Sequence, residues 1–149
     1  FGSYLEDVDF GLRCASKGYT GRYVPDAVSW HVGSATLGRW NAETVRQIAK
    51  NQLLLIARHY PPALIQEFAF QIALSHMLWG FVALRHGGGA AWIRGKLEGL
   101  RTFRQLRKPG SPNVRAIVTQ SEEEIRQYQN GPESDWYWRA YFTGSRWSR

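Results

Sequence analysis

The chain has 149 residues, enough for one domain with a real hydrophobic core, and its formal net charge is +7. Its single cysteine, Cys14, excludes an internal disulfide and is compatible with a reducing compartment. Most of the excess charge lies between Arg85 and Lys108, where seven cations accompany one anion, Glu98. Such a dense basic stretch favours an anionic partner, either lipid head groups or nucleic acid.

The first predicted element is a helix from Tyr4 to Ser16. Its first turn carries Glu6 and Asp7, where the positive end of the helix dipole favours anions. Spacing alone leaves two interpretations open: an ordinary acidic helix start, or a carboxylate placed to take a proton from a substrate hydroxyl. Asp9 and Arg13 are one turn apart, which predicts an ion pair on a shared face.

Two short strands are expected next, at Arg22–Val24 and Ala27–Val32, joined by a Pro-Asp turn into a β-hairpin. The second strand alternates apolar and polar residues, so that His31 points away from the apolar face. The small residues 33–38 that follow predict a flexible loop.

The run YLEDVDFGLRCASKGYTGRYVPDAVSWHVGSAT resembles the C-terminal catalytic half of family-two inverting glycosyltransferases of the GT-A type, especially rhamnosyltransferase-like members. That family carries an acidic ED-x-D element, then LR…GY…Y-x-P-x-A…H, and a Gly/Ser/Thr loop. The resemblance covers residues 1–60. It implies an α/β fold, of which this chain would form the C-terminal part, with a short β-hairpin and mostly α-helices.

The resemblance also implies roles for single residues. Asp7 matches the base that deprotonates the acceptor hydroxyl, and Glu6 precedes it. Asp9 and Arg13 would orient that carboxylate, although a simple structural ion pair is as compatible with the pattern. His31 would bind a divalent metal, Mg or Mn, that neutralises the leaving nucleoside diphosphate, whereas a lone histidine is usually structural. The expected contacts to the diphosphate or the acceptor are Ser34, Thr36, Lys50 and Asn51.

For Lys50 and Asn51 a solvated basic helix face is the more frequent interpretation. The chain departs from the family in one large respect, because the nucleotide-binding strands and the Asp-x-Asp metal motif that belong before Phe1 have no counterpart. One histidine does not hold a hard divalent ion, which requires mostly oxygen ligands. We therefore expect a piece of a longer protein that, by itself, binds neither metal nor nucleotide sugar appreciably and is inactive.

A second clear helix is predicted from Asn41, a good N-cap, to Tyr60, where two prolines stop it. The apolar segment Leu64–Leu84 follows, and as one helix it is long enough to cross ~30 Å of hydrocarbon. A polar stripe at Glu67, Gln71 and Ser75 instead favours a helix that lies in the membrane interface or packs on the catalytic domain. Burial in a larger core is the alternative.

Residues 90–108 predict a basic amphipathic helix, and its cations favour an anionic leaflet. Its expected apolar side is formed by Trp92, Ile93, Leu97, Leu100 and Phe103. Residues 61–110 are thus predicted to be membrane-associating helices at the cytoplasmic face of the cell membrane. Residues 111–149 are predicted to be a tail with two short helices. One begins at a capping box from Ser121 to Glu124, and the other is an aromatic helix capped by Ser134.

Two functions remain open from the sequence. The first is an enzyme that transfers a sugar, with inversion, from a nucleotide-sugar donor to a lipid-linked or polysaccharide acceptor. The second is a non-catalytic basic module that binds anionic membrane or nucleic acid. The first predicts no specific nucleic-acid partner, and a salt-sensitive affinity for generic nucleic acid would favour the second.

Overall fold

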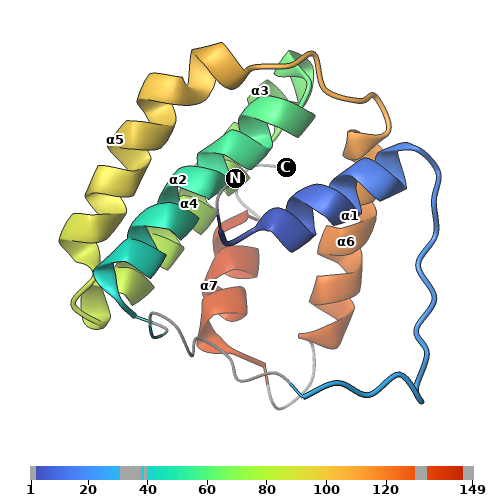
Figure 1. Cartoon of the computed structure of the whole chain (residues 1–149), viewed down its shortest axis with the longest axis horizontal. Helices are drawn as coiled ribbons and strands as arrows, with labels where there is room; N and C mark the ends of the chain where they lie inside the picture. Colours follow the sequence, from blue (N-terminus) through green and yellow to red (C-terminus); the bar gives the residue numbers. More distant parts are fainter. Residues whose placement is uncertain (1–2, 31–37, 39, 130–133, 146–149) are drawn as a thin grey trace.

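The computed structural model describes residues 3–30, 38, 40–129 and 134–145, and these residues form helices and no β-strand. Figure 1 shows α2 and α5 side by side with α4 behind them, while α1 lies against α6 at the opposite side of the molecule. The helices are α1 (Glu6–Ser16), α2 (Ala42–His59), α3 (Pro62–Glu67), α4 (Ala69–Arg85), α5 (Gly89–Leu106), α6 (Val114–Tyr128) and α7 (Trp136–Ser145).

The expected α/β fold with a β-hairpin is wrong for this chain. In the described part of the hairpin region the backbone makes only local turn bonds, from Ala27 N to the Val24 carbonyl (3.1 Å) and from Val28 N to the Asp26 carbonyl (3.0 Å). A strand needs a neighbouring strand for its backbone groups, and no described residue supplies one. The described part of the alternating pattern, residues 27–30, is therefore exposed, and Trp30 is 97% exposed.

The helices predicted for residues 4–16, 41–60 and 90–108 are confirmed as α1, α2 and α5. Asn41 is the N-cap of α2, because its side-chain oxygen accepts a hydrogen bond from Glu43 N at 2.9 Å. The chain turns out of α2 at Tyr60, just before Pro61, as the proline pair predicts.

The single helix predicted over Leu64–Leu84 is divided at Phe68 into α3 and α4. The predicted polar stripe does not form one solvent-exposed face, because Gln71 is buried whereas Glu67 is exposed. Glu67 forms an ion pair with Arg115 at 2.7 Å. None of the described helices combines the length and the apolarity that a membrane span requires.

Both N-cap residues predicted in the tail, Ser121 and Ser134, are wrong. Helix α6 begins at Val114, so Ser121 lies in its middle and does not cap it. The aromatic helix is confirmed as α7, but its N-terminal cap is Asp135, whose carboxylate accepts a hydrogen bond from Tyr137 N at 2.9 Å. Ser134 instead accepts hydrogen bonds from Arg139.

Helices α2 and α5 approach closely because small residues lie between them. A Cβ atom on Gly95 would lie 2.2 Å from the Arg46 carbonyl oxygen and 2.8 Å from the Ala49 Cβ. A Cβ on Gly99 would lie 2.9 Å from a Leu53 methyl carbon. The buried residues Val45, Ala83 and Ala91 extend this contact to α4, with Trp40, Trp79 and Trp92 packed around them. Of the predicted apolar side of α5, Trp92 therefore packs in the core, whereas Ile93, Leu97 and Leu100 are exposed, and the closest contact with α2 is made by Gly95 and Gly99.

Candidate functional site

The start of α1 is fastened to α2 by a buried amide. Asn51 is 1% exposed, and its Nδ2 donates hydrogen bonds to the carbonyl oxygens of Ser3 (2.9 Å) and Tyr4 (2.8 Å). The Tyr4 hydroxyl also bonds the Thr44 hydroxyl at 2.9 Å. Tyr4 and Leu5 have φ angles of 69° and 64°, a left-handed conformation that costs free energy in residues with a side chain. These bonds therefore hold a strained turn in place.

Glu6 and Asp7 follow this turn directly, and both side chains are exposed. One carboxylate oxygen of Asp7 accepts a hydrogen bond from Val8 N at 2.8 Å. Neither residue forms an ion pair with any described side chain. Both carboxylates are thus open to a substrate while the backbone beneath them is fixed.

Asp9 lies on the other side of α1 in a cluster of its own. The ion pair predicted with Arg13 is confirmed at 3.0 Å, and the His59 ring nitrogen Nε2 donates to the second carboxylate oxygen at 2.8 Å. Arg58 lies 3.7 Å from that same oxygen. Burial would raise the pKa of Asp9, but the His59 hydrogen bond and the nearby positive charges outweigh it and lower the pKa. Asp9 is therefore a buried structural anion.

These charged residues line an open cleft of about 470 Å³ together with Lys108. Side chains two positions apart on a helix point about 200° away from each other, so Asp9 and Asp7 face different surroundings. The interpretation of Asp9 and Arg13 as a structural pair thus fits the geometry, and the pair lies apart from the exposed carboxylates.

The other expected site residues fall into two groups. Lys50 and Asn51 lie on α2, where Lys50 is half-buried and Asn51 positions the turn before Glu6 through its bonds to backbone. His31, Ser34 and Thr36 lie outside the described residues. In the described ranges no three His, Cys, Asp or Glu side chains are grouped closely enough to hold a metal ion.

An apolar pocket of about 300 Å³ lies between α1, α6 and α7. Val8 and Leu12 of α1 form one wall, α6 forms another, and Tyr60, Tyr137, Trp138 and Tyr141 supply aromatic surface. Burial raises the pKa of Tyr60 and Tyr137, and it raises the pKa of Tyr141 to about 12. All three phenols are therefore neutral donors at physiological pH.

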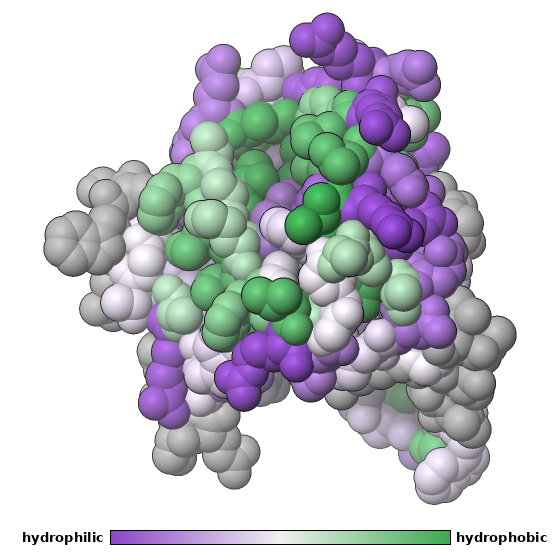
Figure 2. All heavy atoms as spheres, turned by 90° about the vertical axis from the view of Figure 1, so that its left-hand side faces the viewer, coloured by the Kyte–Doolittle hydropathy of each residue, from purple (hydrophilic) through white to green (hydrophobic). Residues whose placement is uncertain are grey.

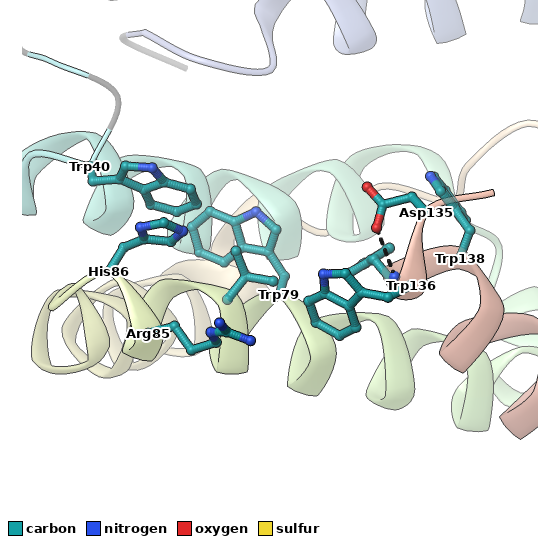
Figure 3. A pocket seen from close by; sticks show the side chains of 9 residues that line it. Trp40, Trp79, Arg85, His86, Asp135, Trp136 and Trp138 are labelled. Carbon is teal, nitrogen blue, oxygen red and sulfur yellow. Dashed lines mark hydrogen bonds between the residues drawn. The ribbon is translucent and has the colours of Figure 1, made fainter. Parts of the chain in front are cut away.

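A larger, open cleft of about 850 Å³ lies between α4 and α7 (Figure 3). At one end Trp40 stacks on His86, with ring centroids 3.9 Å apart and an interplanar angle of 8°. Asp135 and Trp136 lie at the other end. Tyr137 and Trp138 line this cleft as well as the apolar pocket, so the two cavities are neighbours.

Sequence reasoning missed both cavities and the contact between Asp9 and His59. The two residues of that contact are fifty positions apart, and no local spacing predicts it. The abundance of tryptophan was the available signal for the aromatic cleft, but tryptophan is more often core than binding surface.

Three comparisons with known proteins bear on the identity of the chain. No protein-family model matches it, no curated protein does, and no solved structure does.

Proposed function

We propose that this chain supplies the acceptor side of an inverting glycosyltransferase, with Asp7 as the catalytic base. The acceptor oxygen forms a bond to the anomeric carbon of a nucleotide sugar while the bond from that carbon to the diphosphate breaks. The diphosphate leaves with the bonding electron pair, and the Asp7 carboxylate receives the proton of the acceptor hydroxyl. The resemblance of residues 1–60 to family-two transferases motivates this proposal.

The main support for this proposal is that the Glu6–Asp7 turn is exposed to solvent and held in position. A catalytic base must be open to its substrate and also held in position. Asp7 is exposed, whereas the turn before it is fixed to α2 by the Asn51 amide. Asp9, only two residues away, is buried and already paired, so it meets the second requirement but not the first.

The apolar pocket that Val8 and Leu12 of α1 line supports an acceptor of matching chemistry. Its other walls include Tyr60, Tyr137, Trp138 and Tyr141, and the Tyr137 hydroxyl donates a hydrogen bond to the Ser75 carbonyl oxygen at 3.3 Å. Sites of this kind, mostly apolar with a few fixed polar groups, suit a small ligand with both apolar faces and hydroxyls. A sugar or a lipid-linked sugar has this character.

Inverting transferases with a nucleotide-sugar donor commonly use a divalent cation at the leaving diphosphate. The described residues near Asp7 do not provide the oxygen ligands that Mg or Mn requires, and His31 lies outside them. We therefore assign no step to a metal in this chain.

The proposal is tested on the natural polypeptide that carries this sequence. Release of nucleoside diphosphate from dTDP-rhamnose, UDP-galactose and GDP-mannose is measured with a membrane extract as acceptor. We expect release from one donor, abolished by Asp7→Asn and retained by Asp26→Asn, a change in the exposed segment. Release that is equal in both variants would remove Asp7 from the mechanism, and absence of release with every donor would contradict the function.

A further inference from the structure

One outer face of the molecule is apolar although it is exposed to solvent. It is formed by α4 and α5, and we call it the α4–α5 face. Figure 2 shows hydrophobic residues gathered in the middle of this side of the molecule, with hydrophilic residues around them. The exposed apolar members are Phe70, Met77, Phe81 and Leu84 on α4, and Ile93, Leu97 and Leu100 on α5.

These residues lie on one side because of how the two helices contact each other. Gly80 of α4 meets the indole of Trp92, since a Cβ on Gly80 would lie 2.7 Å from that ring. Helical periodicity then places Met77 and Leu84 within about 60° of Gly80 on α4, and Leu100 within about 80° of Trp92 on α5, on the outer side of this contact. Leu84, for example, is 65% exposed. The patch is thus continuous across the two helices.

The α4–α5 face is bordered by cations without compensating acids. Arg94, Arg101 and Arg104 are exposed on α5, and in the described part of the chain none of them forms an ion pair. The only acidic residue of α5 is Glu98, and it is paired with Arg46 of α2. Helix α4 has no acidic residue at all. The border of the apolar patch therefore carries a net positive charge.

We infer that the α4–α5 face docks on the surface of an anionic lipid bilayer. Apolar side chains at the centre suit shallow insertion at the boundary of head groups and acyl chains, and the arginines beside them suit lipid phosphates. Nucleic acid would use the arginines but has no counterpart for so broad an apolar centre. A second copy of the chain would bring the same arginines together, which like-charge repulsion opposes.

The membrane inference rests on this surface alone and does not depend on the proposed sugar transfer. It is tested by flotation of the 149-residue chain with vesicles of phosphatidylcholine, with or without phosphatidylglycerol. We expect binding to the anionic vesicles, and Arg101→Gln/Arg104→Gln should lower the partition coefficient roughly 30-fold. Leu97→Glu/Leu100→Glu should abolish binding, and because both residues are exposed the fold should persist.

Matched control variants separate this surface from bulk charge and bulk hydrophobicity. The matched positions lie in the segment 17–30 that follows α1, which Figure 1 shows on the opposite side of the molecule from α5. Lys17→Gln/Arg22→Gln removes the same charge from exposed positions of this segment, and Tyr23→Glu/Val28→Glu changes exposed apolar residues in it. Both should float like the unmodified chain. The inference would be overturned if a control variant lost as much vesicle binding as the matched variant on the α4–α5 face. It would also be overturned if the unmodified chain did not bind the anionic vesicles. A dimer in vesicle-free solution that Leu97→Glu/Leu100→Glu dissociates would assign the face to a second copy and overturn it too.

Discussion

The side-chain amide of Asn51 donates a hydrogen bond to the carbonyl oxygen of Tyr4 at 2.8 Å, which joins the middle of α2 to the turn that starts α1. The turn is left-handed at Tyr4 and Leu5, a conformation that a short peptide would not keep. A tertiary contact therefore decides where the Glu6–Asp7 turn lies.

Asn51→Leu should release this turn. The substitution leaves the carbonyl oxygens of Ser3 and Tyr4 without their donor, and each lost bond of this kind costs about 1 kcal/mol. We expect a lower free energy of unfolding and faster amide hydrogen exchange in the first turn of α1. Asn113→Leu is the matched control, because Asn113 is exposed and its side-chain amide donates one long hydrogen bond, at 3.4 Å, to the Ser16 carbonyl oxygen. Equal exchange in both variants would count against the role of Asn51.

The contact between α2 and α5 should not tolerate a methyl group at Gly95. A Cβ there meets the Arg46 carbonyl at 2.2 Å, so Gly95→Ala must push the helices apart and should cost about 1–3 kcal/mol in chemical unfolding. Gly11→Ala in α1 is the control, because no atom lies within 4 Å of its Cβ position. That change should stabilise the chain by up to about 1 kcal/mol through helix propensity. The same sign for both variants would contradict this packing.

Stability should rise with pH because of Lys96. Burial lowers the pKa of Lys96 to about 7 in the folded chain, against 10.5 for an unperturbed lysine, and its ammonium or amine donates to Gln52 Oε1 at 2.8 Å. Between these values the unfolded chain binds a proton that the folded chain does not, so the free energy of unfolding increases with pH.

Lys96→Met should remove that increase, and urea unfolding between pH 6 and pH 10 measures it. Lys108→Met, at an exposed position, should leave the slope as it is. A slope that persists in Lys96→Met would show that another group is responsible.

Asp9→Asn should destabilise the fold at neutral pH by about 1.5–3 kcal/mol, because the buried carboxylate loses its charge-assisted hydrogen bonds to Arg13 and His59. The pKa of Asp9 is lowered by its partners, so this contribution is present above the unfolded value of 3.8 and is lost as pH falls through the folded pKa. Denaturant unfolding at pH 7 and near pH 3 should therefore show a difference that shrinks in acid. A difference that grows in acid would exclude this linkage.

The elements that the sequence predicted correctly are those defined by local signals. The Asn41 cap and the proline pair bound α2, and the i,i+4 spacing of Asp9 and Arg13 gave their ion pair. The incorrect predictions concern elements that depend on residues outside the local sequence pattern. Alternation at residues 27–32 predicts a strand only where a second strand exists, and the capping-box pattern at Ser121 gave way to a helix that already began at Val114.

The candidate site divides in the same way. Glu6 and Asp7 are exposed, which a carboxylate that takes a proton from a substrate requires. The position of their turn depends on Asn51, which no local sequence pattern places beside Tyr4. The close approach of α5 to α2 at Gly95 and Gly99 was also not predicted, because the periodicity of large apolar residues does not register glycines. Of those large residues, Trp92 packs in the core and Leu97 and Leu100 are exposed.

We propose that the Asp7 carboxylate takes a proton from the acceptor during sugar transfer. The most direct measurement is the rate of transfer by Asp7→Asn in the natural polypeptide, at equal folded fraction as judged by denaturant unfolding. Because Asp7 is exposed, stability should change by less than about 0.5 kcal/mol while the rate falls about 10²–10⁴-fold. An Asp7→Asn protein that is stably folded and transfers sugar at the unmodified rate would contradict the account.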